Sequence, residues 1–428
     1  MLLKPLALAA ALVAVTALPA TASSSAADTQ LAWLVQASQH EPIATSDLTQ
    51  HFDQTLINGV GGLATLSATL DAFGALTVDQ TITDTPTTVV AIGTTKLGPA
   101  EIELAVDPAG LIGGLQFVPY APQPTTWAGI DAEVRGAAPQ VSFAAMTIDP
   151  NGRCAVVHGI TPNTQRPLGS AFKLYVLGAL GQAVADGRAS WNEQLAIHDE
   201  WKSLPSGVLQ NDPDGTELPL TEYADKMISI SDNTAADHLI HFLGRDAVAA
   251  QLFRFHNENP SSDIPFPTTG ELFRLKSVQY PTLANGYLSL PRPFRGPALD
   301  AIDQIPRSAM SVWTKPENID QIEWFASPTD ICRAYAGLQR ENRTQPQIGT
   351  ALSINDGGLG LNPTAYPTVW FKGGSEPGVL TVNWMVRAAN GRTVVISSML
   401  GNPTANINEF SAIGVLFAIT RAAVTLSQ

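Results

Sequence analysis

The chain has 428 residues, of which 45% are hydrophobic and 14% are charged, and its formal net charge is −14. This composition is typical of a folded globular protein and excludes a largely disordered chain. The acidic balance argues against a nucleic-acid partner, because no basic surface is available to displace counterions from phosphates. The length predicts two or three domains.

The first residues carry the pattern of a secretory signal. A single early charge at Lys4 is followed by an apolar run of about 14 residues and by the small-residue triplet Ala20-Thr21-Ala22. We therefore expect a signal peptide over residues 1–22 and a secreted, extracytoplasmic protein. The run is too short for a stable span, and no later segment offers about 18 continuous apolar residues, so we expect no stable membrane insertion.

The two cysteines, Cys154 and Cys332, both lie beyond this signal. In an oxidising compartment such a pair can form one disulfide, but two buried free thiols are also compatible with the sequence.

A small α+β domain is predicted over residues 28–120. Three segments between about residues 28 and 75 have helical periodicity, and four short alternating runs follow between Ala75 and Pro119. Helices followed by an antiparallel meander predict a curved sheet that wraps a helix. We find no catalytic constellation in this part. A Pro- and Thr-rich connector over residues 120–130 marks the boundary, so the second domain is expected over residues 121–428.

The second domain is predicted to build one sheet from distant parts of the sequence. After a short helix, residues 140–149 and 154–160 have strand character, and residues 381–389 and 392–400 form a second pair joined by the hairpin signal Asn390-Gly391. A helical region is expected between the two pairs. Within it, Ser327, Pro328 and Asp330 have the order that begins a helix.

The stretch RPLGSAFKLYVLGAL (residues 166–180) places one lysine, Lys173, in an otherwise apolar helical pattern. A buried charge without a partner is expensive, so the lysine is expected to find one or to lose its proton. Ser170 lies one helical turn earlier, on the same face. A desolvated lysine with a lowered pKa can act as the base that activates a serine hydroxyl.

Two later motifs can complete such a site. Ser231-Asp232-Asn233 follows a helical segment, and Lys372-Gly373-Gly374-Ser375 ends a strand. Each has a simpler explanation, since Ser, Asp and Asn favour helix N-termini and Gly-Gly is compatible with a bulge in a strand.

Taken in order, S-x-x-K, S-D-N and K-x-G form the motif set of penicillin-recognising serine enzymes. The segment from about Trp127 to Gln428 resembles the serine β-lactamase and penicillin-binding-protein family, in the class A arrangement. The resemblance implies an antiparallel five-stranded sheet flanked by helices, with a helical subdomain. The whole chain is similar to a secreted two-domain branch in which a cystatin-like or steroid-isomerase-like (NTF2-like) domain precedes the hydrolase. One member of that branch lies in clavulanate biosynthetic clusters.

The resemblance also implies a role for each matching residue. Ser170 would be the acylated nucleophile and Lys173 its general base. Ser231 would relay a proton to the leaving group, and Lys372 would tune Ser231 and attract a substrate carboxylate. The substrate would be held by Asn233, Gly374 and Ser375, and the backbone N–H groups of Ser170 and Ser375 would form the oxyanion hole.

Two departures from the family pattern concern turnover and shape. The glutamate that activates the deacylating water has no clear counterpart. Glu271 lies in the matching region but lacks the usual context, and we expect it to face solvent in the first turn of a helix. The family's central hydroxyl residue is replaced by Gly373, and Ser375 can supply that hydroxyl. A Pro-rich excess over residues 280–313 is expected to reshape one wall of the site.

The sequence therefore predicts an exported serine hydrolase that acts on a small molecule: a β-lactam, an ester or a peptidoglycan-like amide, with slow deacylation. The alternative is a binding or sensing module for β-lactams or cell-wall fragments that does not turn over. No cofactor is expected. Asp237, His238 and His241 lie close together on one helix, but they lack a distal third ligand, so a metal site is not expected there either.

Overall fold

The computed structural model describes residues 24–428, so the expected signal peptide lies outside the described residues. Contacts divide the chain into two compact units. The first contains the described residues up to Pro122 together with Asn408–Ala418, and the second contains Gln123–Ile407 together with Ile419–Gln428. Each unit contains one principal sheet with helices, as expected of an α+β chain.

The helical part of the first unit contains one helix more than the sequence predicts within residues 24–75. The second predicted segment is interrupted at Phe52, whose backbone is extended and forms an isolated bridge with Ile112. Asp53 then begins a new helix by accepting the backbone N–H of Leu56. The local sequence does not predict this break, because the break depends on the contact of Phe52 with Ile112. The helices are α1 (Ala26–Ala37), α2 (Thr45–His51), α3 (Gln54–Gly59) and α4 (Leu63–Phe73).

The four predicted strands of the first unit form an antiparallel meander in the order β1-β2-β3-β4. Burial alternates along β2, where Val89 and Ala91 face a core that also contains Leu31 and Leu34 of α1. The strands are β1 (Thr77–Asp84), β2 (Thr88–Thr95), β3 (Gly98–Val106) and β4 (Ile112–Pro119).

The sheet of the second unit confirms the predicted assembly from distant segments. Its antiparallel order is β11-β12-β13-β5-β6, so the strand that carries Lys372 lies at one edge. The central strand β13 pairs with β5 from Thr393↔Ile148 to Gly401↔Gln140. The strands are β5 (Gln140–Ile148), β6 (Cys154–Ile160), β11 (Thr368–Glu376), β12 (Val379–Arg387) and β13 (Thr393–Gly401), with the short pairs β7 (Arg166–Pro167) and β10 (Phe325–Ala326), and β8 (Gln194–Ala196) and β9 (Glu217–Pro219).

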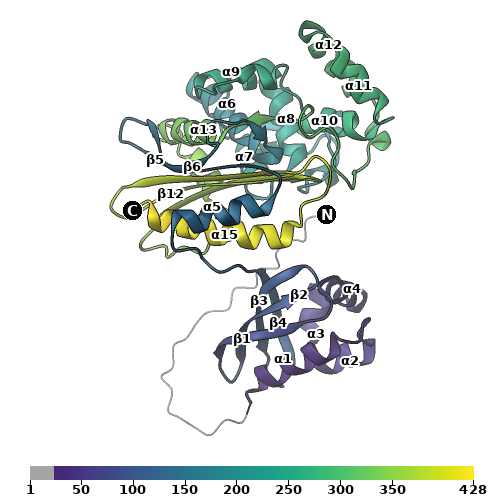
Figure 1. Cartoon of the computed structure of the whole chain (residues 1–428). Helices are drawn as coiled ribbons and strands as arrows, with labels where there is room; N and C mark the ends of the chain where they lie inside the picture. The colour runs from purple at the N-terminus through teal and green to yellow at the C-terminus, as the bar shows by residue number, and fades with distance from the viewer. Residues whose placement is uncertain (1–23) are drawn as a thin grey trace. The chain divides into compact units, whose positions relative to one another are not determined.

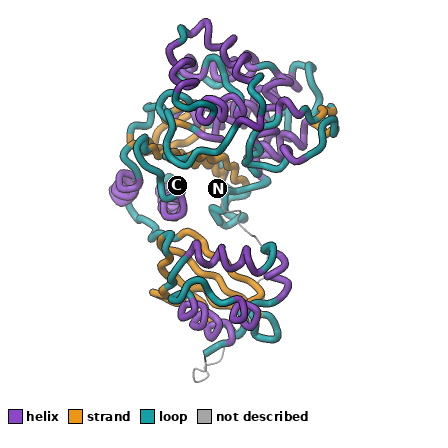
Figure 2. Tube along the Cα trace, turned by 90° about the vertical axis from the view of Figure 1, so that its right-hand side faces the viewer, coloured by secondary structure: helices purple, strands orange, loops and turns teal. Residues whose placement is uncertain are grey.

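Helices cover the sheet of the second unit. Figure 1 shows α5 along one face and the helical region that includes α6 and α13 on the other, and in Figure 2 most of this unit's helices lie on one side of the strands. As predicted, Ser327 and Asp330 form a capping box at the start of α13. The helices are α5 (Trp127–Ala137), α6 (Lys173–Ala185), α7 (Leu220–Ser229), α8 (Asn233–Leu243), α9 (Arg245–Arg254), α10 (Thr269–Ser277), α11 (Thr282–Ser289), α12 (Arg292–Asp303), α13 (Pro328–Glu341) and α14 (Gln347–Ser353). The last helix, α15 (Glu409–Leu426), contains residues of both units.

The cysteine pair is bridged. Cys154 on β6 and Cys332 on α13 form a disulfide across 178 positions of sequence. The bridge therefore decides between the two states that the sequence left open, and it ties an edge strand to a helix that packs on the sheet.

Helix α15 is the one helix in the described part of the chain that is long and apolar enough to cross a membrane. Its mean hydropathy is 1.5, but half of it is buried within the protein. A core helix of a globular protein has the same length and composition.

Candidate active site

The predicted S-x-x-K pair lies where a tight turn continues into a helix. Gly169–Phe172 forms a single 3₁₀ turn that contains Ser170, and α6 begins at Lys173. The sequence predicts one continuous helix through Ser170 and Lys173. It correctly places the two side chains close together, but the first turn is 3₁₀ rather than α-helical. Lys173 Nζ lies 3.2 Å from Ser170 Oγ. Ser170 keeps some exposure, whereas Lys173 is fully buried.

Lys173 also joins Ser170 to the S-D-N motif. Its Nζ lies 2.6 Å from the carbonyl oxygen of Ser231, 3.3 Å from Ser231 Oγ and 2.7 Å from Asn233 Oδ1. Burial lowers the pKa of Lys173 to about 7, and the negative charges of Asp232 and Asp237 oppose this shift. An amine with this pKa is partly neutral near pH 7, so it can accept a proton from a hydroxyl.

The S-D-N motif is held in an unusual turn. Ser231 has a φ of 59°, in the left-handed region that residues with a Cβ rarely adopt. The carbonyl group of Ser231 accepts a hydrogen bond from Ser206 Oγ at 2.6 Å as well as that from Lys173. Asp232 caps α8 by accepting the backbone N–H of Ala235. The expected N-cap is therefore present at Asp232, and the strained serine before it faces the lysine.

The third motif brings a second lysine to Ser231. Lys372 lies on the edge strand β11, and its Nζ is 2.9 Å from Ser231 Oγ and 2.8 Å from the carbonyl oxygen of Gly373. Burial, and then the charge of Lys173, lower the pKa of Lys372 well below its ordinary value. Ser170 Oγ, Lys173 Nζ, Ser231 Oγ and Lys372 Nζ therefore form one continuous chain of contacts.

Two glycines let the Ser170 turn and the end of β11 come into backbone contact. A Cβ on Gly169 would lie 2.8 Å from the backbone nitrogen of Ser375, and a Cβ on Gly374 would overlap the carbonyl oxygen of Leu168 and the nitrogen of Ser170. Gly169 also has a φ of 48°. The two backbone nitrogens assigned to the oxyanion hole thus lie at the same junction, and only residues without a side chain fit there.

Asn233 lies at the buried side of the network. Its Oδ1 accepts a hydrogen bond from Lys173, its Nδ2 donates to the carbonyl oxygen of Leu204, and 7% of its surface is exposed. The structure therefore places Asn233 in contact with the predicted base, Lys173. The bond to Leu204 uses one of the two amide hydrogens of Asn233.

The expectation that Glu271 faces solvent is wrong. Glu271 does lie in the first turn of α10, but it is fully buried. Its Oε1 accepts a hydrogen bond from Arg245 at 2.6 Å, and its Oε2 accepts from Arg245 at 3.1 Å and from the backbone N–H of Thr268 at 2.7 Å. A guanidinium from α9 thus compensates the buried charge, and both oxygens already have donors.

Asp237, His238 and His241 of α8 form contacts with other parts of the second unit. Asp237 accepts the backbone N–H groups of Thr269 and Gly270. Both ring nitrogens of His238 lie within hydrogen-bond distance of backbone groups, and burial lowers the pKa of His238 and of His241 to about 4. The group whose ligand atoms could meet at a metal is instead His198, Glu200 and Asp214, within 4.8 Å of one another among the described residues.

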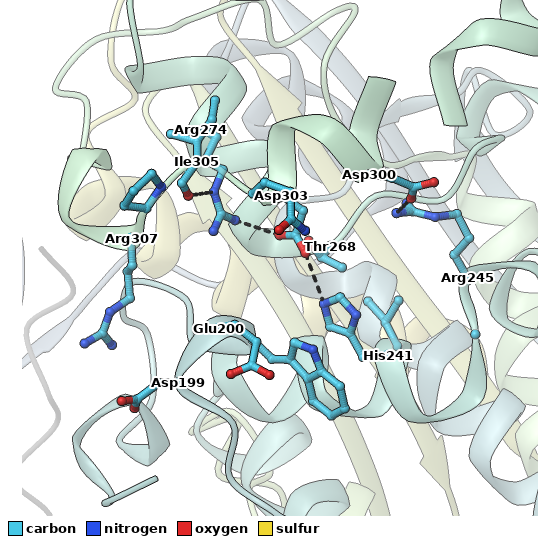
Figure 3. A pocket seen from close by; sticks show the side chains of 15 residues that line it. Asp199, Glu200, His241, Arg245, Thr268, Arg274, Asp300, Asp303, Ile305 and Arg307 are labelled. Atoms are coloured by element: carbon cyan, nitrogen blue, oxygen red, sulfur yellow. Dashed lines mark hydrogen bonds and ion pairs between the residues drawn. The ribbon is translucent and has the colours of Figure 1, made fainter. Parts of the chain in front are cut away.

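A separate cavity of about 470 Å³ lies beside α8, α10 and α12, and Figure 3 shows it from close by. The side chains of Arg274 and His241 both point toward Asp303, at 2.9 Å and 3.7 Å. The Pro-rich insertion thus contributes α11, α12 and one wall of this cavity. None of the predicted site residues lines it.

Some residues of the network carried no signal in the sequence. Ser206 fixes the carbonyl group of Ser231, and Glu323 accepts the backbone N–H of Gly169 at 3.2 Å. Both are far in sequence from the groups that they contact. A single sequence offers no periodicity or motif that joins them.

We predict that Gly374→Ala destabilises the second unit, because the added methyl group has no space at the junction. The free energy of unfolding should fall by about 1–3 kcal/mol, measured by denaturant unfolding. Gly136→Ala in α5 is the control: outside the helix's own backbone and the two neighbouring residues, no atom lies within 4 Å of its Cβ position, so stability should stay unchanged or rise. Equal stability of the two variants would contradict the close contact.

The comparisons with known proteins agree with the motif set. Residues 128–261 match the model of the β-lactamase enzyme family. A β-lactamase structure from Sphaerobacter thermophilus is 22% identical, with a TM-score of 0.48 and coverage of 71% of this chain and 98% of that one. A β-lactamase structure from Chitinophaga pinensis is 17% identical, with a TM-score of 0.49 and coverage of 70% and 98%. The comparison with curated proteins gave no match.

The segment that matches the family model contains both Ser170-x-x-Lys173 and Ser231-Asp232-Asn233. The same residues are joined, together with Lys372, in one hydrogen-bonded network. The second unit is therefore an enzyme, a serine hydrolase of the β-lactamase-like class.

Proposed function

We propose that the protein is an exported hydrolase that forms an acyl-enzyme on Ser170 and acts on a β-lactam, an ester or a peptidoglycan-like amide. The observation that carries the proposal is the continuous contact from Ser170 Oγ through Lys173 and Ser231 to Lys372. A serine hydroxyl becomes a useful nucleophile when a base of suitable pKa lies within hydrogen-bond reach.

Acylation begins with proton transfer to the neutral amine of Lys173. Ser170 Oγ gives its proton to Lys173 Nζ and attacks the carbonyl carbon of the substrate. The negative charge that develops on the carbonyl oxygen is met by the backbone N–H groups of Ser170 and Ser375. Each such donor typically contributes about 3–4 kcal/mol to transition-state stabilisation.

The leaving group receives its proton through Ser231. Lys173 returns the proton to Ser231 Oγ, and Ser231 passes its own hydroxyl proton to the departing nitrogen or oxygen as the bond to the carbonyl carbon breaks. Lys372 donates to Ser231 Oγ and favours the transient negative charge there. Lys372 is also placed to attract a substrate carboxylate, and Asn233 to donate a hydrogen bond to a substrate amide.

Deacylation is proposed to be slow, because the two candidate carboxylates, Glu271 and Asp237, already have partners. Glu271 is paired with Arg245, and Asp237 accepts backbone N–H groups at the start of α10. A carboxylate that serves as general base needs a free oxygen within reach of the attacking water. The acyl group is therefore expected to persist on Ser170.

The remaining parts of the proposal concern the rest of the chain. The signal pattern at residues 1–22 supports export. The helices and four-stranded meander of the first unit support a cystatin-like or steroid-isomerase-like domain, as in the secreted two-domain branch that the chain resembles. The substrate is a small molecule, and the acidic balance supports the absence of a nucleic-acid partner.

The nucleophile is tested by covalent labelling. Fluorescent penicillin or a fluorophosphonate probe should label the wild-type protein, and Ser170→Ala should lose at least about 99% of the label, because removing a nucleophile abolishes acylation. Ser289→Ala, on α11 outside the network, is the matched control and should label normally. Persistent labelling of Ser170→Ala would show that another residue is acylated.

The base is tested by the pH dependence of acylation. Lys173 acts in its neutral form, and burial lowers its pKa from 10.5 to about 7. The acylation rate constant should therefore rise about tenfold per pH unit on the acid side and stop rising near pH 7. Stopped-flow labelling across the range gives the profile. A rate that does not change between about pH 5 and pH 8 would exclude this lysine as the base.

Slow release is tested by intact-mass measurement after exposure to a β-lactam. The adduct should persist for at least minutes, and Glu271→Gln should change its lifetime by less than about twofold, because Glu271 is held by Arg245. Turnover at about 10² per second would contradict slow release.

Hydrolysis of short acyl esters that disappears in Ser170→Ala distinguishes an enzyme from a binding or sensing module.

A further inference from the structure

A buried carboxyl group lies directly behind the backbone that carries Ser170. Glu323 precedes β10, which pairs with β7, and 5% of its surface is exposed. Its Oε2 accepts the backbone N–H of Gly169 at 3.2 Å and that of Trp324 at 2.8 Å. One oxygen of Glu323 thus holds the residue before Ser170.

A second carboxyl group faces the first from the end of β11. Glu376 follows Ser375, and its Oε1 accepts a hydrogen bond from Lys276 at 2.5 Å. Its Oε2 is buried and, with both acids ionised, has no hydrogen-bond donor among the described residues. Two carboxylates cannot donate to each other. A proton on Glu323 would supply the donor that Glu376 lacks.

The charges around this pair favour one shared proton. Lys276 of α10 is the cation that acts on the pair, and Glu317 adds a third carboxyl group from the preceding loop. Burial, and then the charge of Glu376, raise the pKa of Glu323 to about 8, while Lys276 opposes the shift. Burial also raises the pKa of Glu376, and Lys276 opposes this rise. Because Lys276 donates directly to Glu376, Glu376 is the acid that stays ionised, and the proton belongs on Glu323 at neutral pH.

We propose that Glu323 is a positioning residue that donates a proton in a hydrogen bond to Glu376, so that this carboxyl pair fixes the Gly169–Ser170 backbone against the Ser375 end of β11. The pair sets the spacing between the N–H groups of Ser170 and Ser375. This proposal rests on the acylation of Ser170 proposed above. It adds that acylation depends on the protonation state of Glu323.

The consequence is a second limb in the pH profile of acylation. When Glu323 loses its proton, two carboxylates face each other beside one lysine and repel. Gly169 and Ser375 are in close backbone contact, since a Cβ on Gly169 would lie only 2.8 Å from the Ser375 nitrogen. Repulsion between the two carboxylates should therefore disturb this contact. The acylation rate should therefore fall as the pH rises through about 8, opposite in direction to the limb set by Lys173 near pH 7.

The decisive experiment compares Glu323→Gln, Glu323→Ala and the control Glu341→Gln in the full-length protein. Glutamine keeps an acceptor for Gly169 and a donor for Glu376 but does not titrate. It should preserve the rate at neutral pH within about threefold and remove the alkaline limb. Alanine should lower the rate at neutral pH by at least about tenfold. Glu341 on α13 is half-buried, and burial raises its pKa to about 7, so its variant should keep both limbs.

An alkaline limb that survives in Glu323→Gln, or a normal rate in Glu323→Ala, would overturn the proposal. Thermal unfolding provides a readout that does not depend on acylation. The unfolded chain releases this proton near pH 4.5 and the folded chain near pH 8, so wild-type stability should fall across that interval and Glu323→Gln should lessen the fall. If Ser170 is never labelled, the proposed function fails, while an unchanged stability profile in Glu323→Gln rejects the carboxyl pair separately.

Discussion

The buried amino group of Lys173 is the constraint on which the rest of the site depends. An ammonium group removed from water costs several kcal/mol unless the protein supplies partners. Lys173 Nζ donates its hydrogen bonds to neutral oxygens of Ser170, Ser231 and Asn233. Asp232 and Asp237 act on it only through their charges. Burial therefore lowers the pKa of Lys173 to about 7, because no carboxylate in direct contact offsets the loss of water.

The strained turn at Ser231 follows from the same requirement. Its left-handed backbone allows both its carbonyl oxygen and its hydroxyl to face Lys173. A non-glycine residue in such a conformation costs about 1–3 kcal/mol, and it persists only where surrounding contacts compensate. Here the compensation comes from Ser206 on the Ser231 carbonyl group and from the cap that Asp232 provides to α8. The strain therefore lies at the point where the two lysines meet one hydroxyl.

The sequence predicts the parts of this arrangement that depend on local spacing. One helical turn separates Ser170 from Lys173, alternation and turn residues predict the strands of both sheets, and Ser327 predicts the start of α13. The errors depend on long-range contacts. The helix break at Phe52 requires Ile112, and the burial of Glu271 requires Arg245. Glu323 carried no sequence signal because its partner, Gly169, lies 154 positions away.

The proposed slow release of the acyl group agrees with the electrostatics around Lys173. A free carboxylate in contact with Lys173 would act as a counterion and raise the pKa of the lysine, so the amine would stay protonated near neutral pH. The fold instead gives the nearby carboxylates other partners: Arg245 for Glu271 and the start of α10 for Asp237. In the proposed mechanism, these contacts also leave neither carboxylate free to activate a deacylating water. In that mechanism, acylation requires that no free carboxylate contact Lys173, whereas deacylation requires a free carboxylate beside the attacking water.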